Sequence, residues 1–128
     1  MLKKQKKHAL TAIHFRNFIR NCQDWQRRFG MMDFRIEYYM ERLDQDSSCA
    51  ITHFDIEDRA ASITINNQWI VPVTDRTLNA VALHEMAHLM LADLTDLGRE
   101  RHVTAKAIWQ ANEAAVIRIE NCIMGLLK

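Results

Sequence analysis

Two histidines and a glutamate within five residues are the part of this 128-residue chain best suited to chemistry. The segment reads His84-Glu85-Met86-Ala87-His88. On a helix, residues four apart lie one turn apart on the same face, so the two imidazoles can bind one metal ion together. Glu85 projects about 100° from His84, which places its carboxylate beside the metal and not among its ligands. The spacing predicts hydrolysis by a zinc-activated water, with Glu85 as general base.

The alternative interpretation is that this spacing arose by chance and that the two histidines are ordinary surface residues beside a glutamate. The residues around the motif favour the metal site, because they make this the most apolar helix expected in the chain. They are Leu78, Val81, Ala82, Leu83, Met86, Leu89, Met90 and Leu91. Ionisable groups within an apolar helix need partners, and a metal ion supplies one.

A third protein ligand is expected from the last helix. The distance from His88 to the end of its helix near Leu97 is about 13.5 Å at ~1.5 Å per residue. An equal return along an antiparallel helix from about His102 reaches residues 111 to 113, where Glu113 offers a carboxylate. Glu120 lies about 10 Å further along the axis. We therefore predict that Glu113 completes the site.

A group that polarises the substrate carbonyl is also needed for peptide hydrolysis. The candidates are Tyr38, Tyr39, His53 and Arg118. Strand register decides which of these side chains face the metal, so the sequence leaves all four open.

The expected fold is a single α+β domain over residues 1–128, with residues 1–7 as a flexible basic tail. Apolar spacing predicts a helix over residues 8–29. Short strands are expected over 33–43, 49–56 and 60–65, joined as a three-stranded antiparallel meander. A helix over 76–97 carries the histidines, and a helix over 102–126 is expected to pack antiparallel to it.

Charge is distributed unevenly along the chain. Residues 1–30 hold eight basic residues against one acid, a balance of +7, and the rest holds nine against fifteen, a balance of −6. The basic residues within 1–28 suggest a nucleic-acid or partner contact, or simply a solvated helix face. Three cysteines without a CxxC pair, and no apolar stretch of membrane-spanning length, predict a cytoplasmic protein with reduced thiols and no membrane contact.

The HExxH segment together with Glu113 resembles the gluzincin zinc peptidases, in which a glutamate on the following helix is the third ligand. Residues 25–124 are also similar to small HExxH proteins encoded by bacteriophages and their hosts, which would place this chain in the host cytoplasm if it is phage-encoded. More distant likenesses are to ImmA/IrrE-type and SprT-like proteases. In the SprT-like family a histidine some fifteen residues after the second one is the third ligand, and His102 follows His88 by fourteen.

Two functions are consistent with these patterns. The first is a minimal zincin-like metallopeptidase that binds one zinc ion per chain and hydrolyses a protein or peptide substrate. The alternative is a zinc-binding phage-type or host regulatory protein without protease activity, associated with nucleic acid as SprT-like proteins are.

Overall fold

The computed structural model describes residues 6–44, 48–100 and 102–126, which form an α+β fold. The expected basic tail lies mostly outside this part of the chain. The described helices are α1 (Ala12–Arg28), α2 (Asp75–Met90), α3 (Ala92–Leu97) and α4 (Ala105–Leu126). The strands are β1 (His8–Ala9), β2 (Arg35–Glu41), β3 (Ala50–Asp55), β4 (Ala60–Asn66) and β5 (Gln68–Trp69).

Helix α1 begins and ends close to the predicted residues because both of its ends carry local signals. Thr11 and His14 form a capping box, in which each side chain accepts a hydrogen bond from the other residue's backbone N–H. Gly30 follows the helix with a φ of 69°, a left-handed conformation that glycine adopts without strain. The predicted first turn is instead β1, which pairs antiparallel with β5.

The main sheet has the order β2-β4-β3, so the predicted meander is wrong. Strand β4 lies in the middle, parallel to β2 and antiparallel to β3. The reason is visible in the side chains: Ile63 and Ile65 of β4 are completely buried, whereas β2 alternates apolar residues with exposed charges such as Glu37. A charged strand suits an edge and an apolar strand suits the centre.

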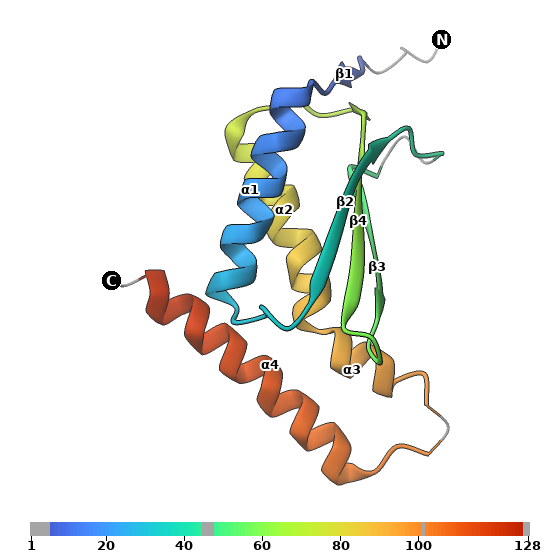
Figure 1. Ribbon diagram of the computed structural model, residues 1–128, viewed down its shortest axis with the longest axis vertical. Helices are drawn as coiled ribbons and strands as arrows, with labels where there is room; N and C mark the ends of the chain where they lie inside the picture. The colour runs from blue at the N-terminus through green and yellow to red at the C-terminus, as the bar shows by residue number, and fades with distance from the viewer. Residues whose placement is uncertain (1–5, 45–47, 101, 127–128) are drawn as a thin grey trace.

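Helices α1 and α2 lie side by side over one face of this sheet (Figure 1). The core between them and β4 includes Phe18 of α1, Met86 and Leu89 of α2, and Ile63, all without solvent exposure. This packing fixes the rotation of α2 about its axis. The residues between the buried positions of α2, including the two histidines, therefore face outward.

The predicted helix over 76–97 is broken into α2 and α3 at Leu91. Arg118 of α4 donates a hydrogen bond of 3.1 Å to the carbonyl oxygen of Met90, the last residue of α2. Helix α4 packs against α3 and α1, and Figure 1 shows it crossing obliquely below the end of α2. The expected antiparallel packing along α2 is thus not what the structure shows.

Candidate metal centre

His84 and His88 lie together on the exposed side of α2, as the sequence predicts. Their rings are in edge-to-face contact, with centroids 4.9 Å apart and an interplanar angle of 86°. One potential ligand atom from each of His84, Glu85 and His88 lies within 4.8 Å of the others. Both imidazoles are solvent-accessible, so an ion can reach them without opening the core.

Glu85 points to the other side, toward the sheet. Its side chain is only 4% exposed, and Oε2 accepts a hydrogen bond of 2.5 Å from the Thr52 hydroxyl on β3. In the part of the chain that the structure describes, Glu85 forms no ion pair. A buried carboxylate without a cation is costly, so this donor set fits a metal ion that neutralises it.

A pocket of about 440 Å³ opens between α2 and the start of β3. Its lining residues are Ser48, Cys49, Ala50, Ala80, Val81, His84 and Glu85. The pocket thus connects the metal-ligand candidates to an edge strand. Among the described strands, β3 is at the edge of the sheet: it pairs with β4 on one side and with no strand on the other.

The main chain of β3 offers hydrogen-bonding groups along this edge. The Cys49 carbonyl accepts a bond of 2.8 Å from the N–H of Asn66, which identifies these two residues as a hydrogen-bonded pair of the antiparallel ladder. Because such pairs alternate with non-bonded pairs, the main-chain groups of Ala50, Thr52 and Phe54 face away from β4. An extended peptide could pair with them.

Two thiols, those of Cys22 and Cys49, lie close enough to Glu85 to interact with its charge. Burial, together with the Glu85 charge, raises the pKa of both Cys22 and Cys49. Burial and the nearby Cys22 raise the pKa of Tyr38. Both thiols and the phenol are therefore neutral at pH 7, and the thiols add no second negative charge beside Glu85.

The third-ligand candidates lie outside the histidine cluster. Glu113 does not belong to the group of potential ligand atoms, and neither does His102, which is exposed before α4 begins. Helix α4 buries Ala111 and Ala115 toward the body of the protein. Glu113 lies two residues from Ala111, about 200° around the helix from that buried side, and is half-buried.

The candidates for carbonyl polarisation are also separated from the histidines. Tyr39 and His53 alternate with the inward residues of their strands and lie on the sheet face opposite α2. Tyr38 faces inward, but it shares a row with Ile63 and Thr52 and is therefore two strands, about 10 Å, from Thr52. Its buried hydroxyl has no hydrogen-bond partner in the part of the chain that the structure describes.

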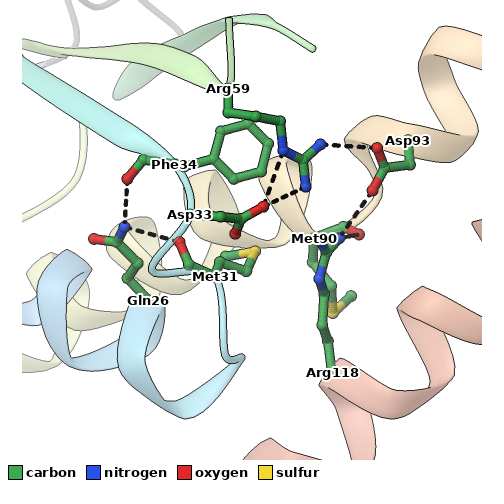
Figure 2. A network of polar contacts seen from close by, with 8 residues as sticks. All are labelled: Gln26, Met31, Asp33, Phe34, Arg59, Met90, Asp93 and Arg118. Atoms are coloured by element: carbon green, nitrogen blue, oxygen red, sulfur yellow. Dashed lines mark hydrogen bonds and ion pairs between the residues drawn. The ribbon is translucent and has the colours of Figure 1, made fainter. Parts of the chain in front are cut away.

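Arg118, the fourth of these candidates, belongs to a network of ion pairs below α2 (Figure 2). Arg59 donates to Asp33 at 2.6 and 2.9 Å and to Asp93 at 2.9 Å, and Arg118 contacts the other oxygen of Asp93 at 3.4 Å. The network joins the loop before β2, the β3–β4 turn, α3 and α4. Arg118 therefore stabilises the fold and the end of α2.

Acid should weaken this network. Partial burial alone would raise the pKa of Asp33, but the hydrogen bond and charge of Arg59 hold it below its ordinary value. Asp33 thus stabilises the fold above its unfolded pKa of about 3.9, and this contribution is lost as the pH falls through the lower folded value.

We expect urea unfolding between pH 7 and 2.5 to show a smaller loss of unfolding free energy in acid for Asp33→Asn than for wild type. The difference should be below about 1 kcal/mol, because Asp33 is half exposed. Asp58→Asn, outside the network, is the control, and equal acid loss in wild type and Asp33→Asn would contradict the assignment.

Thr52 was not identified from the sequence, because its role depends on strand register. We expect Thr52→Val to lower the free energy of unfolding by about 1–3 kcal/mol, since the buried Glu85 carboxylate loses its hydroxyl donor. Urea unfolding measures this loss, with Thr64→Val on the opposite sheet face as the matched control. In a Glu85→Ala background the Thr52→Val loss should shrink; an undiminished loss would show that it does not act through Glu85.

The basic residues of the first helix are partly engaged within α1. Arg27 pairs with Asp24, and the Arg28 guanidinium lies 5.2 Å from the centre of the Trp25 ring. Arg16 and Arg20 are exposed. This part of α1 therefore offers a modest positively charged face. Lys3 and Lys4 of the predicted basic tail lie outside the described residues.

Within the described residues, no helix has the length and apolar character needed to cross a membrane. Comparisons of the chain with protein-family models, curated proteins and solved structures found no match.

Proposed function

We propose that this protein is a zinc-dependent metallopeptidase. The observation that carries the proposal is the placement of Glu85. It is buried beside two exposed histidines, has no cationic partner among the described residues, and lies next to an open pocket along the edge of β3. A buried structural glutamate would be expected to have a basic partner. A carboxylate that works beside a metal has the ion instead.

His84 and His88 would hold the ion through imidazole nitrogens, the usual zinc ligands. When bound, zinc lowers the pKa of a coordinated water toward ~7 and so makes it a nucleophile at neutral pH. Glu85 would accept the water proton and deliver it to the leaving amine. Its Oε2 is held by the Thr52 hydroxyl, which leaves Oε1 for the proton.

The substrate proposed for this site is an extended peptide segment. The free main-chain groups of Ala50, Thr52 and Phe54 would pair with its backbone, as in β-strand addition. The pocket between β3 and α2 would then direct a peptide carbonyl toward His84. Because main-chain pairing does not read side chains, this mode favours unfolded or flexible segments of many sequences.

Hydrolysis of a mixed library of quenched fluorescent peptides tests the proposal. We expect cleavage by the zinc-loaded protein, loss of cleavage with a chelator, and recovery on return of zinc. Mass spectrometry of the products should show cleaved peptide bonds. A folded, zinc-loaded protein that leaves the library and denatured casein intact would overturn the peptidase proposal.

A further inference from the structure

Helix α4 carries an apolar stripe on the side turned away from its own chain. Trp109 is 63% exposed, Ile117 is 51% exposed and Val116 is 37% exposed. Glu113 lies one turn from Trp109 and one turn from Ile117, at the centre of this stripe. Helix α4 packs against α3 and α1, and its buried residues Ala111 and Ala115 lie on the side opposite the stripe.

Helix α2 carries a second uncovered stripe, which includes the metal-ligand candidates. Leu83 is 37% exposed, and Leu91, the residue that follows α2, is 40% exposed. His84 and His88 lie between them along the helix. His84 also lines the pocket along β3, whereas Leu83, about 100° from His84 around the helix, does not.

The two stripes match in length and in chemistry. Trp109 to Ile117 and Leu83 to Leu91 each span eight residues, about 12 Å of helix. Each stripe has apolar ends and a polar centre, a carboxylate on α4 and two imidazoles on α2. Zinc held by two neutral imidazoles would keep its full double positive charge. A carboxylate ligand would cancel half of that charge and is one of the ligand types that zinc prefers.

We propose that Glu113 of a second copy of this chain completes the zinc site by docking α4 against the exposed stripe of α2. The inference rests on the proposed zinc site at His84 and His88. Within the described residues, Glu113 does not belong to the group formed by the histidines of its own chain, so a second chain would supply this carboxylate. Two-fold symmetry makes the exchange reciprocal and gives two sites per dimer.

Sedimentation velocity and zinc titration of wild type, Glu113→Gln and Glu120→Gln provide the first test. We expect zinc to bind at one ion per chain to a dimer of wild type. Glu113→Gln should bind zinc more than about 100-fold more weakly and lose the zinc-bound dimer, since even loss of a group that only supports a ligand costs roughly 10–100-fold. Glu120→Gln, an exposed glutamate two turns further on the same helix, should behave as wild type.

Mixing two defective chains provides the decisive test. A chain with His84→Ala and His88→Ala still has Glu113, and a Glu113→Gln chain still has both histidines. Neither alone should bind zinc tightly, and their mixture should form a heterodimer with one tightly bound zinc, seen by native mass spectrometry. Tight zinc in a wild-type monomer, or no tight zinc in the mixture, would overturn the inference and leave the peptidase proposal standing. No zinc binding by folded wild type at any protein concentration would overturn both.

Discussion

Replacing Glu85 by glutamine is expected to lower the rate of peptide hydrolysis by roughly 10²–10⁴-fold, the range of a single general base. Zinc affinity should change little, because the proposed ligands are the imidazoles of His84 and His88. The glutamine has nearly the same shape, and its amide oxygen can still accept the hydrogen bond from Thr52. The variant therefore separates proton transfer from metal binding.

The measurement is kcat and KM on the best peptide of the library, with zinc content determined on the same sample. Glu57→Gln, an exposed glutamate on the β3–β4 turn, is the matched control and should retain the wild-type rate. A Glu85→Gln protein that keeps its zinc and its full rate would show that Glu85 is not the base. Loss of zinc together with the rate would instead make Glu85 a ligand or a structural support.

Replacing His88 by alanine is expected to remove most of the stabilisation that zinc gives to the fold. An ion that binds only the folded state stabilises it by about 2.7 kcal/mol at 100 times its Kd and by about 4.1 kcal/mol at 1,000 times its Kd. Because His88 is exposed, its loss should change the stability of the zinc-free protein by less than about 0.5 kcal/mol. The effect should thus appear only when zinc is present.

Urea unfolding with and without a fixed excess of zinc measures both quantities at one protein concentration. His53→Ala is the control, because His53 is an exposed histidine on the opposite sheet face. We expect His53→Ala to gain as much stability from zinc as wild type and His88→Ala to gain far less. Equal gains in all three proteins would contradict a zinc site at His88.

The helices were predictable because their signals are local. Thr11 and Thr74 cap α1 and α2 through hydrogen bonds to residues three positions later, and Gly30 follows α1. Strand order was not predictable in the same way. The eight residues between β2 and β3 suit a hairpin as well as a crossover, and the choice depends on packing Ile63 and Ile65 at the centre of the sheet.

In the candidate site, too, the residues placed by one helix could be predicted and those placed by tertiary contacts could not. His84, Glu85 and His88 were found by spacing because one helix places all three. Thr52 comes from a strand 33 positions away in the sequence, and its contact with Glu85 depends on register. The prediction for Glu113 depends on one continuous helix to Leu97 with an antiparallel helix beside it, whereas the helix breaks at Leu91 and α4 packs against α3 and α1.

X-ray absorption at the zinc edge tests the central claim most directly, because it counts the atoms bound to the ion. For the wild-type protein loaded with one zinc per chain, the account predicts two imidazole nitrogens at about 2.0–2.1 Å and oxygen ligands at about 2.0–2.2 Å, without sulfur. His84→Ala should lose the imidazole signal along with tight binding. A zinc shell containing sulfur from cysteine, or no imidazole at all, would contradict the account.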